Sequence, residues 1–475
     1  MSELLRADLC VIGGGAGGLS VAAGASQMGA RVVLFESGAM GGDCLNHGCV
    51  PSKSILAAGR ARARQRRDEV FGIRSEPGET DFEAVKAHIR GVIAQIAPHD
   101  SVERFEGLGV RVVRERARFV APDRVRGGST EVRARRFVIA TGSMPAIPPI
   151  PGLAEVPYLT NETIFDADRL PEHLLVIGGG PIGIELAQAF RNLGARVTVI
   201  EMATILVRDD PELVDLLRTR LRGDGIELVE NARVVSAGGR EGRVVLQVDE
   251  GGGEPRTIEG SHLLVATGRV PSLADLDLDT AGIKATPRGV TVNRSLRSSN
   301  RRVYAIGDAA GRWQLTHVAG YEAGVVVRNV LFRLPARVDD SAVPRVTYCD
   351  PELASVGLGE AEARARHGRV EVLRWHLAEN DRAVAERDTE GCVKVIVTSR
   401  GHILGASVLA THAGEMVQLW CLAIQKRVGI GAVAQTILPY PTFGEASKRA
   451  AGGFYTPRLF SDRTRRVVRM LARLG

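Results

Sequence analysis

The glycine-rich stretch "CVIGGGAGGLSVA" at residues 10–22 decides the fold, because it recurs as "LVIGGGPIGIELA" at residues 175–187. Each copy consists of a short apolar run, a glycine loop and a helix-like continuation. The segment "MGARVVLFE" at 28–36 also recurs, as "LGARVTVIE" at 193–201, with the same spacing from its glycine loop. This internal duplication predicts two dinucleotide-binding folds of the α/β class.

The glycines of each copy have separate physical roles. The first permits a sharp turn from strand to helix, the second lets the backbone approach a pyrophosphate, and the third lets helix and strand pack closely. The phosphates would lie at the helix N-terminus, where unpaired N–H groups favour anions. About 20 residues further on, Glu36 and Glu201 stand where a ribose contact is required. The glycines are Gly13, Gly15 and Gly18 in the first copy and Gly178, Gly180 and Gly183 in the second.

Further strand-like segments complete the predicted domains. "RRFVIATGS" (135–143) and "HLLVATGRVPS" (262–272) each end in Ala-Thr-Gly and close a nucleotide-binding unit, while "RRVYAIGDAAG" (301–311) leads into Asp308. Thr141, Gly142 and Gly268 are therefore candidate cofactor-binding residues. The sequence predicts a first dinucleotide-binding domain at 1–150 and 273–340, a second one inserted at 151–272, and a third domain at 341–475.

Composition excludes several other classes of function. A chain of 475 residues is too long for a single core. Its net charge is +7, but the basic residues are scattered among acids and aromatic residues make up only 4%, so we expect no nucleic-acid partner. The sequence contains no long apolar stretch free of glycine, so it predicts no membrane-spanning segment. The N-terminal residues include Glu3 and Asp8, unlike a signal peptide, so we expect a cytoplasmic location.

The stretch "GGDCLNHGCVPSKSIL" at residues 41–56 places Cys44 and Cys49 close together. A structural disulfide, half of a metal site and a redox pair are the three interpretations. A zinc site would need two more ligands at short spacing, and His47 is the only neighbour. Pro51 suits the first turn of a helix, whose N-terminus lowers the pKa of a thiol. The pattern therefore favours a redox pair without a resident metal ion. Gly42 leaves room for a flat ring.

The motifs "GGDCLNHGCVPSK", "IGGGPIGIE" and "YAIGDAAG", in this order, resemble the pyridine nucleotide–disulfide oxidoreductases, the family of dihydrolipoamide dehydrogenase, glutathione reductase and mercuric reductase. The resemblance covers essentially the whole chain. It implies FAD in the first domain, NAD(P)H in the second and a homodimer formed through the third. It also implies that Cys49 faces the flavin and that Cys44 is the interchange thiol that meets the electron acceptor.

The same resemblance implies roles for five further residues. Lys53 would lie beside the flavin N5 and pair with Glu185. Glu36 would bind the ribose of FAD, and Asp308 its ribityl or phosphate region. His317 would either belong to the segment that covers the flavin pyrimidine or serve only in packing.

Two residues bear on the choice of nicotinamide nucleotide. Glu201 would accept hydrogen bonds from ribose hydroxyls and repel a 2′-phosphate, which favours NADH. Arg208 lies near the position where NADPH-dependent relatives place arginines, although a solvated charge is the simpler interpretation. NADPH is therefore the alternative.

The segment "LPYPTFGEASKRA" (438–450) departs from the pattern of the disulfide-reducing members. Glu445 is in place, but Tyr440 replaces the histidine that acts as acid–base toward the interchange thiol. A tyrosine titrates near about 10 and a histidine near about 6.5, so Tyr440 is a poor proton acceptor at neutral pH. Mercuric reductases carry a tyrosine here and are the most similar branch. The end of this chain, however, lacks their C-terminal cysteine pair.

The sequence thus predicts an FAD-dependent oxidoreductase that passes electrons from NADH through FAD and Cys44–Cys49 to a metal ion, a quinone or a disulfide. Tyr440 and Glu445 of the partner subunit would line the acceptor pocket. Mercuric reductase, dihydrolipoamide dehydrogenase and a non-catalytic redox sensor are the alternatives. The segment 460–474 has an apolar face and five arginines, which indicates docking onto the dimer, with an anionic membrane as the alternative.

Overall fold

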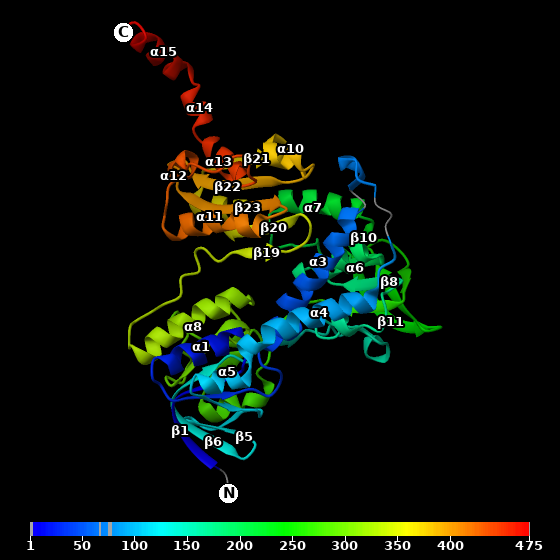
Figure 1. Cartoon of the computed structure of the whole chain (residues 1–475), viewed down its shortest axis with the longest axis vertical. Helices are drawn as coiled ribbons and strands as arrows, with labels where there is room; N and C mark the ends of the chain where they lie inside the picture. The colour runs from blue at the N-terminus through cyan, green and yellow to red at the C-terminus, as the bar shows by residue number, and fades with distance from the viewer. Residues whose placement is uncertain (1–2, 66–67, 75–77, 475) are drawn as a thin grey trace. The chain divides into compact units, whose positions relative to one another are not determined.

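The computed structural model describes residues 3–65, 68–74 and 78–474 (Figure 1). The chain forms two compact units. The first comprises Met1–Gly178, Leu193–Ala195 and Val234–Asp339. The second comprises Gly179–Asn192, Arg196–Arg233 and Asp340–Gly475. Both combine helices with sheets, which confirms the predicted α/β class.

A seven-stranded sheet forms the centre of the first unit, in the order β3-β2-β1-β6-β5-β4 with β18 paired to β6. The strands β3, β2, β1, β6 and β18 are parallel, and β4 and β5 extend the sheet as antiparallel strands. The strands are β1 (Glu3–Ile12), β2 (Val32–Phe35), β3 (Val110–Val113), β4 (Arg118–Ala121), β5 (Arg124–Gly127), β6 (Thr130–Ile139) and β18 (Val303–Ala305).

Both faces of this sheet are covered, which explains the apolar run at the end of β1. Cys10 and Ile12 enter one hydrophobic cluster, whereas Leu9 and Val11, which point to the opposite face, enter another. Figure 1 shows α1 and α8 side by side, and residues of both helices belong to the second cluster. The helices are α1 (Ala16–Gln27), α2 (Gly42–Asn46), α3 (Cys49–Gln65), α4 (Phe82–Ile96), α5 (Val102–Gly107) and α8 (Thr316–Leu331).

Smaller β-structure completes the first unit. Here β14 runs parallel to β8, β15 pairs antiparallel with β7, and β12 pairs antiparallel with β13. The strands are β7 (Ser143–Pro145), β8 (His173–Ile177), β11 (Arg233–Arg240), β12 (Arg243–Asp249), β13 (Arg256–Gly260), β14 (His262–Val265), β15 (Arg269–Pro271), β16 (Ala285–Thr286) and β17 (Gly289–Val290). The 3-10 helices are η1 (Asp68–Phe71), η2 (Ala97–Asp100), η3 (Leu153–Glu155), η4 (Ile164–Asp166), η5 (Ala274–Leu276), η6 (Leu278–Ala281) and η7 (Gly307–Ala310).

The second unit contains a five-stranded antiparallel sheet in the order β19-β20-β23-β22-β21. Residues of α11, α12 and α13 pack against it around the fully buried Trp420. The strands are β9 (Arg196–Glu201), β10 (Ile226–Glu230), β19 (Arg345–Thr347), β20 (Glu352–Gly357), β21 (Val370–His376), β22 (Cys392–Thr398) and β23 (Ile403–Ala410). The helices are α6 (Pro181–Leu193), α7 (Pro211–Gly223), α9 (Glu360–His367), α10 (Asp381–Ala385), α11 (Ala413–Gln425), α12 (Ile430–Gln435), α13 (Glu445–Gly452), α14 (Thr456–Leu459) and α15 (Asp462–Leu471), with the 3-10 helix η8 (Leu377–Glu379).

The C-terminal helix α15 has no buried residue. Its apolar side chains Val467, Val468 and Leu471 are 45%, 57% and 54% exposed. The docking of this helix on the dimer, with an anionic membrane as the alternative, stays a prediction. So do the domain boundaries at 150, 272 and 340.

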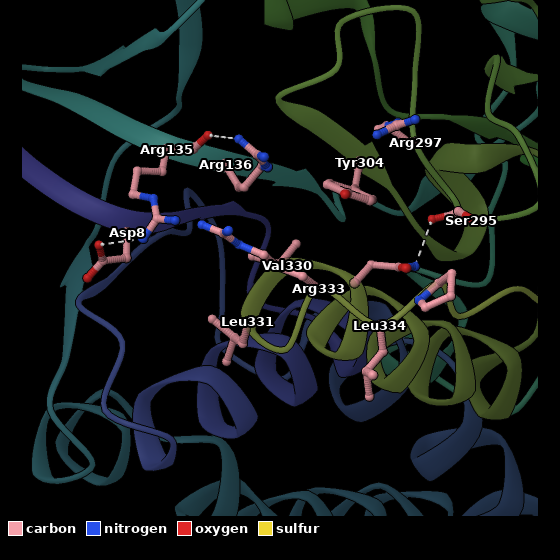
Figure 2. A pocket seen from close by; sticks show the side chains of 12 residues that line it. Asp8, Arg135, Arg136, Ser295, Arg297, Tyr304, Val330, Leu331, Arg333 and Leu334 are labelled. Carbon is pink, nitrogen blue, oxygen red and sulfur yellow. Dashed lines mark hydrogen bonds and ion pairs between the residues drawn. The ribbon is translucent and has the colours of Figure 1, made fainter.

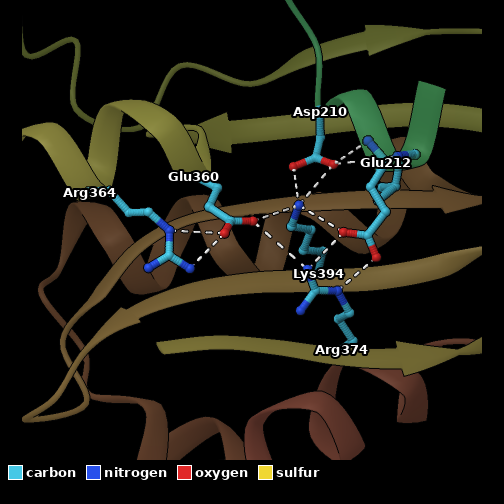
Figure 3. Close-up of polar contacts among 7 residues, drawn as sticks. Asp210, Glu212, Glu360, Arg364, Arg374 and Lys394 are labelled. Carbon is cyan, nitrogen blue, oxygen red and sulfur yellow. Dashed lines mark hydrogen bonds and ion pairs between the residues drawn. The ribbon is translucent and has the colours of Figure 1, made fainter. Parts of the chain in front are cut away.

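A buried lysine holds together three elements of the second unit (Figure 3). Lys394 on β22 is 4% exposed. Its Nζ lies 2.9 Å from Asp210 Oδ2, just before α7, and 2.9 Å from Glu212 Oε2, in the first turn of α7. It also lies 3.0 Å from Glu360 Oε2 of α9. Arg374 completes the cluster: its hydrogen bonds lower the pKa of Glu212 to about 2. The cluster therefore ties α7 and α9 to the sheet.

Replacement of Lys394 by methionine is expected to lower the free energy of unfolding by about 3–5 kcal/mol, because three carboxylates would lose their shared buried cation. Urea denaturation at pH 7 measures the effect. The matched control is Lys426→Met, which changes an exposed lysine at the end of α11 and should stay within about 0.5 kcal/mol of the wild type. Equal losses in the two variants would contradict the structural role of the cluster.

Candidate active site

Cys44 and Cys49 lie on two successive short elements of the first unit. Cys44 is in α2 and half-buried, while Cys49 is the exposed first residue of α3. Gly41 and Gly42, at the start of this loop, have φ values of +87° and +62°, which favour glycine. A Cβ atom on Gly42 would lie 2.7 Å from the Cα of Gly15, so only glycine lets the loop approach the first fingerprint this closely.

The two thiols are in chemically different surroundings. A hydrogen bond between their side chains, together with burial, raises the pKa of Cys44. Cys49 lies at the N-terminus of α3, whose dipole favours a thiolate, and its Sγ lies 3.4 Å from Thr316 Oγ1. The arrangement thus supports Cys49 as the group that carries the negative charge and Cys44 as the group that remains protonated.

Arg269 connects the cysteine loop to Asp308 of the predicted flavin site, and sequence reasoning missed this arginine. Arg269 lies 3.2 Å from Asp43, the neighbour of Cys44, and 4.0 Å from Asp308. Its Nη1 also donates to Asn161 Oδ1 at 3.1 Å, and Asn161 in turn donates to Asp43 at 3.2 Å. Burial raises the pKa of Asp308, and this is opposed by a hydrogen bond from Ser143 and by the charge of Arg269. The only available signal was that Arg269 follows the candidate Gly268.

The first predicted ribose-binding acid is held firmly by the backbone around it. Glu36 Oε2 accepts a hydrogen bond from Gly14 N at 2.6 Å, and its Oε1 accepts one from Gly38 N at 2.5 Å. These contacts fix the carboxylate beside the glycine loop that precedes α1.

The second acid repeats this arrangement within the second unit. Glu201 Oε2 accepts from Gly179 N at 2.6 Å, and Oε1 accepts from Ala203 N at 2.9 Å. The two copies of the repeated sequence therefore make the same hydrogen bonds between a glutamate and the backbone around it. Arg208, seven residues further along the chain, is exposed.

The residues around the first fingerprint fit a bound dinucleotide. Gly13 has φ +108°, and a Cβ atom there would lie 2.3 Å from Ala140 O. A Cβ atom on Gly18 would lie 1.8 Å from Gly13 O, which explains the close packing of α1 on β1. Thr141 Oγ1 is buried and has no hydrogen-bond partner in the described part of the chain, so it is available to a ligand. Gly142 follows it with φ +68°.

In the second fingerprint, Gly178 repeats the local requirement found at Gly13. A Cβ atom on Gly178, which has φ +112°, would lie 2.4 Å from Ala266 O. Gly180 accepts the first hydrogen bond of α6 from Ile184 N at 3.0 Å, and a Cβ atom on it would meet nothing within 4 Å. Gly183 is buried inside α6, and Gly268 has φ +126° after β14.

Lys53 and Glu185 belong to different units. Lys53 lies on α3, and its Nζ donates to Ser52 Oγ at 3.3 Å. Glu185 on α6 is 5% exposed, and its Oε1 accepts a hydrogen bond from Tyr348 N at 2.8 Å. Their pairing stays a prediction. His317 is exposed in the first turn of α8, so it is no core residue of its unit, and its contact with the flavin also stays a prediction.

Tyr440 is 69% exposed, and its hydroxyl donates to Asp381 Oδ2 at 2.9 Å. The hydrogen bond to Asp381 and the charge of this carboxylate raise the pKa of Tyr440. The phenolate, which is the form able to accept a proton, is therefore even rarer at neutral pH than it is in a free tyrosine. Glu445 is the first residue of α13.

Comparison with known proteins adds the family. Residues 7–323 match the family model described as pyridine nucleotide-disulphide oxidoreductase. The chain belongs to this family. Residues 343–451 match its dimerisation domain, which supports a homodimer. The protein is thus an FAD-dependent NAD(P)H disulfide oxidoreductase.

Two branches of the family are represented among the similar curated proteins. A mercuric reductase of Streptomyces lividans is 36% identical over 94% of this chain and 96% of the relative. A mercuric reductase of Staphylococcus aureus is 33% identical over 94% of this chain and 82% of the relative. A dihydrolipoyl dehydrogenase of Geobacillus stearothermophilus is 35% identical over 94% of this chain and 96% of the relative.

Solved structures of the same family have a similar fold. The Cu(II) complex of the HOCl-induced flavoprotein disulfide reductase RclA from Escherichia coli has a TM-score of 0.84 at 26% identity, covering 93% of this chain and 98% of that one. LpdA from Mycobacterium tuberculosis has a TM-score of 0.86 at 26% identity, covering 96% of this chain and 100% of that one.

The described residues include no helix that is long and apolar enough to cross a membrane. They also include no group of three His, Cys, Asp or Glu residues arranged to hold a metal ion.

Proposed function

We propose that the protein transfers electrons from NADH, through FAD and the Cys44–Cys49 pair, to a thiol-binding metal ion. The observation that carries this proposal is that a chain with two neighbouring thiols, Cys44 and Cys49, has Tyr440 in place of the acid–base histidine, and the hydrogen bond to Asp381 raises the pKa of this tyrosine. Reduction of a disulfide substrate needs a proton donor and acceptor beside the interchange thiol, whereas a soft metal ion needs only thiolates. The similar mercuric reductases, and RclA with Cu(II), support this class of acceptor.

FAD, held at the first glycine fingerprint, would supply the two-electron chemistry that links NADH to the Cys44–Cys49 disulfide. Reduction breaks the Cys44–Cys49 bond and leaves a thiolate, stabilised on Cys49 by the N-terminus of α3, and a proton on Cys44. Loss of that proton lets both sulfurs bind the acceptor ion. Two electrons then pass to the acceptor, converting Hg(II) to Hg(0) or two Cu(II) to two Cu(I), and the disulfide forms again.

Other residues of the chain would hold the reactants in place. Arg269 fixes Asp43 and thereby the helix that carries Cys44. Glu36 and Glu201, each held by two backbone N–H groups, would accept hydrogen bonds from the hydroxyls of the two riboses. The proposed catalytic residues are Cys44, Cys49, Lys53, Glu185, and Tyr440 with Glu445 of the partner subunit. FAD would be bound by Gly13, Gly15, Gly18, Glu36, Gly42, Lys53, Thr141, Gly142, Asp308 and His317. NADH would be bound by Gly178, Gly180, Gly183, Glu201 and Gly268.

The test measures NADH oxidation by the FAD-loaded protein with Hg(II), Cu(II), lipoamide, glutathione disulfide or a quinone as acceptor. The proposal expects at least about tenfold faster turnover with one of the metal ions than with either disulfide or the quinone. Faster turnover with a disulfide or a quinone would overturn the acceptor class. Negligible turnover with every acceptor would favour the redox sensor. NADPH replaces NADH in a parallel series, and equal rates would contradict the role given to Glu201.

Dihydrolipoamide dehydrogenase remains the second candidate, because a relative of that name is 35% identical to this chain. We expect Tyr440→His to raise lipoamide reduction at pH 7 by about tenfold or more, since an imidazole near pKa 6.5 accepts a proton that the phenol does not. Turnover with metal ions should not rise. Tyr440→Phe is the control, because it also loses the hydrogen bond to Asp381 but supplies no base. An equal increase in both variants would contradict the argument.

A further inference from the structure

A cavity of about 380 Å³ opens beside the C-terminal end of α8 in the first unit (Figure 2). It shares no lining residue with the glycine fingerprints or the cysteine loop. Its charged and phenolic lining consists of Arg135, Arg136, Arg297, Arg333, Asp8 and Tyr304. These residues come from β1, β6, β18, the loop before β18 and the turn after α8, so the cavity depends on the folded unit rather than on one local segment.

The positive charge of the cavity is poorly compensated. Asp8, its only carboxylate, is already engaged by Arg31 at 3.2 Å and Arg135 at 3.7 Å. Hydrogen bonds from Arg31, followed by the charges of both arginines, lower the pKa of Asp8, so it remains an anion. In the described part of the chain, Arg136 and Arg333 have no carboxylate within ion-pair distance. Figure 2 shows Arg333 pointing toward Arg135 and Arg136. Like charges held together in this way are stabilised by a bound anion.

The segment that carries Arg333 is held rigidly. Arg333 has φ +53°, a backbone conformation that favours glycine or asparagine over arginine. Asn329 of α8 braces the turn: its Nδ2 donates to Ala336 O at 3.0 Å, and its Oδ1 accepts from Ala336 N at 3.0 Å. Across the cavity, Arg136 Nη1 donates to Arg135 O at 2.9 Å. The guanidinium of Arg136 and the backbone that carries Arg333 are therefore held in place before any ligand arrives, which lowers the entropy cost of binding.

Besides the polar Ser295 and Asn329, the rest of the lining is apolar. Tyr304 is 5% exposed, and Val330, Leu331 and Leu334 line the cavity beside it. A volume of about 380 Å³ lies within the range of small-molecule sites. Guanidinium groups recognise phosphate oxygens in a bidentate manner. We propose that this cavity binds a free organic phosphate of the nucleotide class, with its phosphates on the arginines and its base on the apolar wall. The proposal is independent of the electron acceptor.

The proposal is tested by calorimetric titration of the FAD-loaded protein with ADP, in the presence of saturating NAD⁺ to fill the nicotinamide site. We expect one ADP per protomer, with binding weakened by added salt. Arg136→Gln and Arg333→Gln should each weaken binding about tenfold or more. Arg90→Gln is the matched control, because it removes an equal charge from an exposed position on α4. Flavin absorbance checks that every variant is folded and loaded.

The outcomes distinguish the proposal from its failure. Absence of ADP binding under these conditions would overturn it, and so would equal affinity in Arg136→Gln and Arg90→Gln. A parallel titration with inorganic pyrophosphate tests whether the apolar wall contributes to the affinity for ADP. ADP should bind more tightly than pyrophosphate, and Leu334→Ser should reduce the difference. If the two ligands bind equally, the nucleotide class is wrong and the cavity is only a phosphate site.

Discussion

Replacement of Cys49 by serine is expected to abolish the long-wavelength thiolate-to-flavin absorption band of the NADH-reduced protein and to lower acceptor turnover roughly a thousandfold or more. The reason is that Cys49 is the first residue of α3, where the helix dipole stabilises a thiolate. A hydrogen bond to Cys49, together with burial, raises the pKa of Cys44. In the proposed route, loss of the disulfide leaves electrons no path from the flavin to the acceptor. Anaerobic absorption spectra and steady-state NADH oxidation measure the two effects.

Two further variants make this prediction specific. Cys44→Ser should keep a thiolate band, because Cys49 remains at the N-terminus of α3, but should lose turnover to a similar extent. Cys421→Ser is the matched control: Cys421 is also half-buried, but it lies on α11 in the other unit, so its spectrum and turnover should equal those of the wild type. A persistent band in Cys49→Ser, or its loss in Cys44→Ser alone, would show that the two cysteines have the opposite roles.

Replacement of Glu36 by glutamine is expected to weaken FAD binding by about 10–100-fold. Both oxygens of this carboxylate accept backbone hydrogen bonds, from Gly14 N at 2.6 Å and Gly38 N at 2.5 Å. An amide of the same shape directs its NH₂ group at one of these N–H donors, so a repulsive contact replaces a charge-assisted hydrogen bond. The glycine loop that should hold the pyrophosphate would shift with it.

Flavin absorbance per protein after gel filtration, and fluorescence titration of the apoprotein with FAD, measure this loss. Glu106→Gln is the matched control, because it removes an equal charge from an exposed position on α5 and should retain FAD fully. The corresponding Glu201→Gln should weaken NADH binding but leave FAD in place, since Glu201 holds the second glycine loop. Full FAD retention in Glu36→Gln would contradict the ribose-binding role of Glu36.

The parts of the site that the sequence predicted depend on local backbone geometry. Gly13, Gly42 and Gly178 were recognisable because each adopts a positive φ, and at each a Cβ atom would clash with a neighbouring backbone atom. The duplicated acids, Glu36 and Glu201, were found by their spacing, and the structure shows that both bind the backbone of a glycine loop. Local requirements of this kind leave a pattern in a single sequence.

Contacts between residues far apart in the chain left no such pattern. Arg269 forms an ion pair with Asp43, more than two hundred residues earlier in the chain. Lys394 forms ion pairs with carboxylates of two helices, α7 and α9. Single arginines and lysines are normally solvated, so nothing in their type indicated that these two are largely buried. The roles of Lys53 with Glu185, and of Tyr440 across the dimer, stay predictions because they involve different units or subunits, which no local pattern relates.

The most direct test of the central claim is an anaerobic titration of the purified protein with NADH while the full absorption spectrum is recorded. The proposed route predicts a long-wavelength thiolate-to-flavin band that grows to completion after about one equivalent, because the electron pair then resides on Cys44 and Cys49. Direct bleaching of the flavin without this band would show that electrons stop at FAD, and would contradict the proposed redox function of the two cysteines.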